Sequence, residues 1–268
     1  MDQDAGGSRG GGPAAWLRAV VPPLVLALAV LVLWQALVVG TATSALLVPS
    51  PAAILGSLVD DADLFARNAV VTLVEILIGF ALGALVGVGL GVLLGYSRVV
   101  ERSAYPWLVA SQMVPIVAVA PILVVWFGFT LVPKVLVVGL VSFFPVVVTT
   151  IDGLRSVDPQ MVELMRSLGA GRTRIMRSVR FPAALPSIFS GLRVAMALAV
   201  VGAVFGEWVG SSSGLGYLML AFNNQLATTE LFAAVVVLSA MGIALFSLVG
   251  AVERLVVPWG HARRGAGR

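Results

Sequence analysis

The chain has 268 residues, of which 59% are hydrophobic and only 11% are charged, and its mean hydropathy is +1.04. Soluble domains usually contain about 25% charged residues, so this composition excludes an ordinary soluble domain and indicates a membrane protein. Cysteine is absent, which excludes disulfides and thiolate chemistry.

Six apolar runs are each long enough to cross about 30 Å of hydrocarbon as a helix. The runs are residues 20–40, 69–95, 104–129, 135–151, 186–208 and 231–257. They do not alternate apolar and polar residues, which favours helices over a barrel because backbone groups in lipid must be satisfied within each segment. We therefore predict an all-α polytopic membrane protein with six transmembrane helices.

The first run follows a glycine-rich tail. A cleaved secretory signal is the alternative to a membrane span here, but the apolar stretch is longer than the roughly 7 to 15 residues of a typical signal core. We predict a disordered tail over residues 1–15, a membrane domain over 16–259 and a basic tail over 260–268.

Basic residues are distributed unequally between the predicted loops. If the N-terminus lies in the cytoplasm, only Arg67 and Lys134 of the 17 lysine and arginine residues lie outside. Loops rich in Lys and Arg stay in the cytoplasm, so both termini are predicted to be cytoplasmic. The net charge of +4 is then a result of topology, and the expected partner is the lipid bilayer rather than nucleic acid.

Two longer segments are expected on the outer side. In residues 41–68, Ser50 before Pro51 predicts a helix start, and the stretch AAILGSLVDDADLF predicts a short amphipathic helix. Residues 209–230 are expected as a loop. This loop offers three polar side chains to an extracellular binding protein, with a plain polar loop as the alternative: Asn223, Asn224 and Gln225.

Glycines and prolines mark two kinds of site within the spans. In the second span, glycine recurs at every fourth position from Gly79 to Gly95, a ridge that favours close helix packing over a substrate role. The third span contains three prolines, Pro106, Pro115 and Pro121. Such breaks free backbone polar groups and are tolerated where they line a cavity, so we expect the translocation path beside Gln112 and Pro115.

Two carboxylates lie within the predicted spans. A charge in hydrocarbon is costly and by default marks a pathway or a buried pair. Glu75 lies about two turns into the second span, with a structural pair or an interfacial position as its alternatives. Glu207 lies near the outer end of the fifth span, where an exposed rim position is the alternative. Arg193 is expected to snorkel to the cytoplasmic interface or to pair within the neighbouring loop.

A basic stretch, residues 152–185, joins the fourth and fifth spans. Asp158 before a proline predicts a helix start, and Gly169 suits the left-handed residue after a helix end. An apolar stripe at helical spacing lies between them: Met161, Leu164, Met165 and Leu168. A second short helix is expected to follow, interrupted by Pro182 and Pro186. The unit is either a solvated loop that enforces topology or touches anionic lipid, or a docking surface for a protein that covers the stripe.

The spacing of Glu163, Gly169, Val179, Phe181 and Pro182 resembles a known loop. It is similar to the EAA loop of binding-protein-dependent ABC importer permeases, written E-A-A-x3-G-x9-I-x-L-P. Here Leu and Met replace the two alanines, and Val and Phe replace the Ile and Leu. The spacing is intact and all four replacements are apolar.

Four further segments resemble the nitrate, sulfonate and taurine type of permease: PSPAAIL, FFPVVVTTIDGLRSVDP, FPAALPSIFSGLRVA and GEWVGSSSGLGYLM. Glu75, DGLRSVDP and GEWVG are more similar to members that transport pyrimidine-containing vitamin precursors or riboflavin. The resemblance implies a type I importer bundle in the cytoplasmic membrane of a prokaryote.

The resemblance also implies partners. They are a second permease copy in a homodimer, two cytoplasmic ABC ATPase subunits and an extracytoplasmic solute-binding protein. ATP-driven closure of the ATPases switches such permeases between inward-open and outward-open states.

The implied ATPase-coupling residues are Glu163, Arg166, Gly169, Arg172, Arg174, Val179 and Pro182. The candidate translocation path comprises Glu75, Gln112, Pro115 and Glu207.

Enzyme and metal chemistry are not expected. Lys134 is the sole lysine and follows Val-Pro, so the chain has no G-x-x-x-x-G-K-[ST] phosphate loop and ATP hydrolysis must come from a partner. The stretch GSSSG fits the G-x-S-x-G hydrolase pattern. The single histidine, His261, lies in the predicted cytoplasmic tail, on the opposite side of the membrane from GSSSG, so no Ser-His pair is available. No cofactor or metal ligand spacing is present. The remaining rival is an ion-gradient-driven secondary transporter or channel, for which Glu75 alone offers a coupling group and no inverted repeat is evident.

Overall fold

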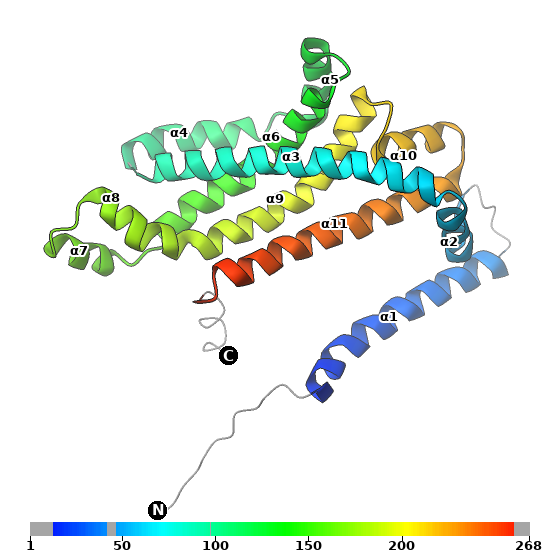
Figure 1. Cartoon of the computed structure of the whole chain (residues 1–268), viewed down its shortest axis with the longest axis horizontal. Coiled ribbons are helices and arrows are strands. Elements are labelled where there is room, and N and C mark those ends of the chain that lie inside the picture. The colour runs from blue at the N-terminus through cyan, green and yellow to red at the C-terminus, as the bar shows by residue number, and fades with distance from the viewer. Residues whose placement is uncertain (1–12, 42–46, 97, 260–268) are drawn as a thin grey trace, which may run out of the picture.

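The computed structural model describes residues 13–41, 47–96 and 98–259. Within these ranges the chain is helical and has no strand, so the prediction of an all-α fold is confirmed (Figure 1). The helices are α1 (Pro13–Gly40), α2 (Pro51–Asp60), α3 (Ala62–Gly95), α4 (Arg98–Ser111), α5 (Ile116–Phe127), α6 (Leu131–Arg155), α7 (Pro159–Ser167), α8 (Arg172–Ile175), the π-helical turn η1 (Met176–Arg180), α9 (Phe181–Gly210), α10 (Leu215–Asn224) and α11 (Thr228–Val256). The predicted tails lie outside the described residues, except that residues 13–15 already belong to α1.

Five helical stretches are long and apolar enough to cross a membrane: Val21–Gly40, Ala62–Gly95, Leu131–Arg155, Arg172–Gly210 and Thr228–Val256. The third predicted run is divided instead into two helices, Arg102–Ser111 and Ile116–Phe127, which are inclined at 87°. Pro115 stands at the bend, and a proline disfavours the helical conformation in the residue before it. The described chain has six spans if this bent pair is one of them.

α3 and α6 pack at close range along the glycine ridge of α3. A Cβ atom on Gly83 would lie 2.5 Å from the carbonyl oxygen of Gly139, and one on Gly87 would lie 2.9 Å from that of Phe143. The other three glycines of the ridge also face α6: Gly79, Gly91 and Gly95. The predicted packing role of the ridge is confirmed, because only residues without a side chain allow the two backbones to approach this closely.

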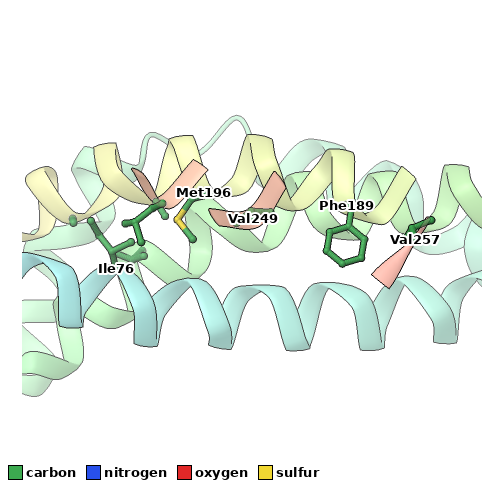
Figure 2. Packing of buried hydrophobic residues seen from close by; sticks show 9 residues of the cluster. Ile76, Phe189, Met196, Val249 and Val257 are labelled. Carbon is green, nitrogen blue, oxygen red and sulfur yellow. The ribbon is translucent and has the colours of Figure 1, made fainter. Parts of the chain in front are cut away.

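α9 lies beside α6, and α11 packs against α9 and α3. Figure 2 shows the apolar cluster between these helices, with Ile76 from α3, Phe189 and Met196 from α9, Val249 from α11 and Val257 at the end of α11. All five side chains are buried. In a membrane, such a cluster stabilises the bundle through van der Waals packing rather than through exclusion of water.

α1 lies apart from the other long helices (Figure 1). Its apolar side chains are almost all exposed, for example Leu26 at 67%. It meets the rest of the chain near its end, where the rings of Trp34 and Phe232 are 6.2 Å apart and Gln35 Oε1 accepts a hydrogen bond from Ala52 N at 3.1 Å. The remaining surface of α1 is therefore available to lipid or to other subunits.

The segment between α1 and α3 begins as predicted and ends differently. Ser50 caps α2, since its hydroxyl accepts a hydrogen bond from Ala53 N at 3.2 Å. The amphipathic helix expected to reach Phe65 ends at Asp60, because Asp61 has a non-helical backbone with φ −108° and ψ 25°. The remainder of the stretch forms the first turn of α3.

The segment expected as a loop over residues 209–230 contains α10, so that expectation is wrong. α10 buries Leu215 and Leu218 in a cluster with Phe65 of α3 and Ala233 of α11. Its N-terminal end is held by side chains of α3 and α9 rather than by a cap of its own, which is why no local capping pattern indicates it.

The prolines at 182 and 186 do not interrupt the chain as predicted. α8, η1 and α9 follow one another directly, and Arg172–Gly210 is one continuous helical stretch. In the π-helical turn, Phe181 N donates to the carbonyl of Met176, five residues back. A proline lacks an N–H and clashes with the carbonyl four residues before it, and the wider turn relieves this conflict without breaking the helix.

Candidate functional site

α7, Gly169 and α8 form the helix, glycine turn and helix that the sequence predicts. Asp158 Oδ1 accepts a hydrogen bond from Gln160 N at 2.8 Å and so caps the start of α7. Gly169 has a φ of +78°, the left-handed conformation that favours glycine. Gly169 N donates to Arg166 O, and Ala170 N donates to Met165 O, both at 2.9 Å. These two bonds make a Schellman motif, which satisfies the last carbonyls of the helix and fixes the direction of the turn.

One face of α7 is apolar and exposed. Met161, Leu164 and Leu168 have exposed fractions of 49%, 54% and 73%, and Met165 is half-buried. No described residue covers this face. An apolar stripe of this kind at the edge of a bundle is typical of a helix that binds a partner.

The opposite face of α7 borders a cavity of about 700 Å³. Pro159, Val162, Glu163 and Arg166 line it, at positions i, i+3, i+4 and i+7. The apolar face has the same spacing shifted by two residues, which is a rotation of roughly 200° around the helix axis. Glu163 and Arg166 are exposed but therefore lie on the cavity side of α7, not within its apolar face.

The other implied coupling residues lie beyond the turn, exposed on α8 or half-buried where η1 joins α9: Arg172 and Arg174, Val179 and Pro182. The hydroxyl groups of Tyr96 and Thr173 form a hydrogen bond of 3.2 Å, which ties α8 to the end of α3. Ile175 and Met176 are buried against the bundle. The structure therefore brings all seven implied residues to one end of the bundle and anchors the second half of the unit firmly.

A second group of charged residues is buried at the other end of the bundle. Glu75 of α3, Lys134 of α6 and Glu207 of α9 have exposed fractions of 0%, 7% and 1%; we call them the buried polar cluster. Lys134 Nζ forms an ion pair with Glu75 and donates a hydrogen bond to Ser211 Oγ at 3.1 Å. Lys134 was expected in an outer loop, but it lies in the first turn of α6 and its side chain points into the bundle.

Glu207 caps the start of α10 from another helix. Its Oε2 accepts hydrogen bonds from Gly216 N at 2.5 Å and Tyr217 N at 3.2 Å, and its Oε1 accepts one from Thr72 Oγ at 2.6 Å. Leu215 N donates to Thr72 Oγ at 2.8 Å. A carboxylate at a helix start satisfies free N–H groups and interacts favourably with the helix dipole. Glu207 is thus not the exposed rim residue that was its alternative.

Two further details complete this capping network. Gly214 N donates to Asn68 Oδ1 at 2.7 Å. Gly214 has a φ of +108°, and a Cβ atom at this position would collide with the Glu207 carboxylate. The GSSSG stretch is therefore a turn shaped around Glu207.

The other two candidate path residues do not join this cluster. Gln112 and Pro115 are exposed at the bend between α4 and α5. Within the described ranges, neither forms a hydrogen bond with Glu75 or Glu207. The four residues predicted as one path therefore fall into two places, a buried cluster and an exposed bend.

Sequence reasoning missed Lys134, Thr72 and Asn68. A signal was present for two of them, because Asn68, Thr72 and Glu75 follow the i, i+4, i+7 spacing of one helix face. Arg193 also differs from its prediction. Its partner is Glu253 of α11, at 2.6 Å, rather than a residue of the neighbouring loop.

Comparison with known proteins identifies relatives over most of the chain. Residues 83–259 match the family described as binding-protein-dependent transport system inner membrane component. The chain is 39% identical to the formylaminopyrimidine transport permease protein of Halalkalibacterium halodurans, over 88% of this chain and 95% of that protein. It is 38% identical to the riboflavin transport system permease protein of Chloroflexus aurantiacus, over 88% of this chain and 89% of that protein.

Among solved structures, an inward-facing form of the MetNI methionine ABC transporter has a similar fold. The TM-score is 0.65 at 20% sequence identity, and the match covers 74% of this chain and 98% of that chain. The helical bundle is therefore that of a type I ABC importer permease. The chain belongs to the binding-protein-dependent transport system inner membrane component family, and is thus a multi-pass permease subunit of a bacterial ABC importer for small solutes.

Proposed function

We propose that this permease imports a pyrimidine-containing thiamine precursor, with riboflavin as the second candidate solute. The formylaminopyrimidine and riboflavin permeases are 39% and 38% identical to the chain. The aliphatic sulfonate permease of Bacillus subtilis and the taurine permease of Escherichia coli are 32% and 29% identical. Both preferred relatives act on nitrogen heterocycles, which supports a heteroaromatic solute over a small sulfonate.

The exposed apolar face of α7 is the observation that supports coupling to a separate ATPase. In our proposal this face enters a cleft on the ATPase, and Arg172 and Arg174 of α8 add polar contacts beside it. Glu163, Arg166, Val179 and Pro182 support the docking element from its inner side. Gly169 sets the angle between the two short helices, so ATPase closure is transmitted through α8 and η1 into α9.

The remaining partners follow from the same assignment. The distribution of basic residues supports cytoplasmic termini, which place α7 on the side where an ATPase is found. A second copy of the chain completes the pathway as a homodimer, and a solute-binding protein delivers the solute at the opposite side. The exposed tip between α10 and α11, with Asn223, Asn224 and Gln225, is its proposed contact.

We also propose that the four candidate path residues have two different roles. Gln112 and Pro115 lie at the exposed bend and are the residues that meet the solute. Glu75 and Glu207 shape the path indirectly, because the buried polar cluster holds α10 in position against α3 and α9.

Gly169→Val tests the coupling role, with Gly171→Val as a matched control. Neither position has an atom within 4 Å of an added Cβ, so steric space is equal. Gly169 has positive φ, whereas Gly171 is extended with φ −70° and ψ 165°, a conformation that valine adopts readily. We expect Gly169→Val to abolish ATP-driven uptake while membrane insertion stays normal, and Gly171→Val to transport solute. Normal uptake by Gly169→Val would remove the coupling role.

The solute is tested by uptake into proteoliposomes that contain the whole transporter and its binding protein. Formylaminopyrimidine, riboflavin and taurine are offered separately, first with ATP inside and ion gradients collapsed, and then without ATP under an imposed ion gradient. Import of the pyrimidine that depends on ATP is the expected result. Uptake that persists without ATP but requires an ion gradient would favour the secondary transporter instead.

A further inference from the structure

The cavity on the side of α7 opposite its apolar face has an arginine-rich lining. Its described lining includes four arginines from four different elements, together with one carboxylate, Glu163. The arginines are Arg102 of α4, Arg155 at the end of α6, Arg166 of α7 and Arg180 of η1. A smaller adjoining cavity of about 280 Å³ shares Arg166 and Arg180 and adds Arg172. Positive charge therefore gathers around one hollow at the end of the bundle.

Most of this charge is not balanced by the described chain. Arg102, Arg166 and Arg180 form no ion pair or side-chain hydrogen bond within the described ranges. Arg180 is half-buried, and its Nε is fully buried without a hydrogen-bond partner there. Arg193 Nε is buried without a partner as well, but the Arg193 guanidinium pairs with Glu253 through Nη2 at 2.6 Å, whereas Arg180 has no carboxylate partner among the described residues. A buried guanidinium N–H without an acceptor is costly, so a missing acceptor is indicated.

Helix ends explain only part of the arrangement. Arg155 and Arg166 stand in the last turns of α6 and α7, where the helix dipole favours a positive side chain. Arg102 and Arg180 have no such role. Like charges around one cavity also repel each other unless an anion lies between them.

We propose that this cavity binds a phosphate-bearing anion. Guanidinium groups match phosphate oxygens in geometry and charge, and several arginines around one pocket are a common phosphate site. A volume of about 700 Å³ lies within the range of roughly 300 to 1,000 Å³ for small-ligand sites. A phosphate in this position joins α7 through Arg166 to α4 through Arg102 and to η1 through Arg180. The phosphate thereby stabilises α7 from the side opposite its apolar face.

This site is compatible with a partner on the exposed face of α7. The cavity face and the apolar face are on opposite sides of the helix, so a ligand in the cavity does not block docking. The two sources of the phosphate are a lipid headgroup at the membrane surface and free phosphate in solution. Both present the same group to the arginines.

The test uses the whole transporter in nanodiscs of phosphatidylcholine, with each ATPase site filled by one equivalent of a non-hydrolysable ATP analogue, so that no free nucleotide competes for the cavity. Inorganic phosphate is titrated in one arm, and phosphatidylglycerol is added to the discs in the other. The readouts are the melting temperature and, for the lipid, its retention in native mass spectrometry. The site variants are Arg180→Gln and Arg102→Gln. Arg177→Gln, an exposed arginine of the same turn that lines neither cavity, is the control.

We expect at least one probe to raise the melting temperature of the wild type and of Arg177→Gln. Each site variant should need about ten- to a hundredfold more of that probe, because each loses a charge-assisted hydrogen bond. A response to phosphatidylglycerol alone assigns the site to a lipid headgroup, and a response to phosphate alone assigns it to a soluble anion. The proposal is overturned if neither probe acts, or if both site variants, folded as judged by an unchanged melting temperature without probe, respond like the wild type.

Discussion

α7 and α10 are two short helices of similar length at opposite ends of the bundle, and they are held in opposite ways (Figure 1). α7 is capped by its own neighbour in sequence, Asp158, and ends in a turn made by its own backbone. α10 is capped by residues of two other helices, Thr72 of α3, which lies 143 residues before Leu215, and Glu207 at the end of α9. The first helix is defined locally and keeps its apolar face exposed, whereas the second is defined by its neighbours and buries its apolar residues.

Charged residues therefore have different surroundings at the two ends of the bundle. The charged side chains of α7, Glu163 and Arg166, remain in contact with solvent on the cavity side of the helix. The charges around α10 are removed from solvent, and they are tolerated because each is paired or hydrogen-bonded. A helix that binds a partner must be stabilised by its own residues before the partner binds, whereas a helix of the core can be stabilised by the helices around it.

Lys134→Met should give the largest effect, because it leaves Glu75 buried and without its counter-charge. Removing one partner of a buried pair costs about 3–5 kcal/mol, so the melting temperature in detergent should fall strongly. The double variant Lys134→Met with Glu75→Gln removes both charges and should recover much of the loss. Two results would contradict a stabilising pair at this end of the bundle. The single variant would melt at the same temperature as the wild type, or the double variant would melt no higher than the single one.

Glu207→Ala should have the second largest effect. It leaves the buried N–H groups of Gly216 and Tyr217 without their acceptor, which costs on the order of 3 kcal/mol. Asp158→Ala removes the corresponding cap of α7, where solvent can replace it, and should cost only about 1 kcal/mol. Thermal unfolding of both variants measures the difference. Equal losses would show that the cap that α9 supplies to α10 contributes no more than the local cap of α7.

Leu164→Ser should have the smallest effect on stability and the most specific effect on assembly. Leu164 is 54% exposed, so the variant should melt within about 0.5 kcal/mol of the wild type. Co-purification with the ATPase should nevertheless be lost, because a polar group replaces an apolar contact. Leu218→Ser in α10 is the matched comparison. Its side chain is 6% exposed, and the change should cost about 2–5 kcal/mol. An unchanged ATPase complex with Leu164→Ser contradicts docking through the apolar face.

The features that could be predicted from the sequence are those that depend on near neighbours. The cap at Asp158, the left-handed Gly169 and the stripe on α7 follow from spacing within one helix turn or two. The glycine ridge of α3 could also be predicted, because small residues at every fourth position have few other uses in a membrane helix. The resemblance of the loop to ABC permeases agrees with the family match for the same reason, since its motif is continuous in the chain.

The features that were missed depend on contacts between distant segments. Lys134 follows an apolar run and precedes another, so its position within α6 and its pairing with Glu75 cannot be read from its own neighbourhood. α10 lacks a local cap, since its caps come from α3 and α9. The π-helical turn before Pro182 exists because the continuous helix is favoured enough by packing to absorb two prolines.

The membrane class, the helical fold, the uneven distribution of basic residues and the helix, glycine turn and helix around Gly169 all follow from the sequence, because hydropathy, charge and turn chemistry act over a few residues. Three features depend on tertiary packing: Glu75, Lys134 and Glu207 form one cluster, α7 turns Glu163 and Arg166 toward a cavity, and four arginines share this cavity. These features depend on how whole helices rotate and pack against each other. Rotation of a helix is set by the sum of its contacts with several neighbours, which no single stretch of sequence contains.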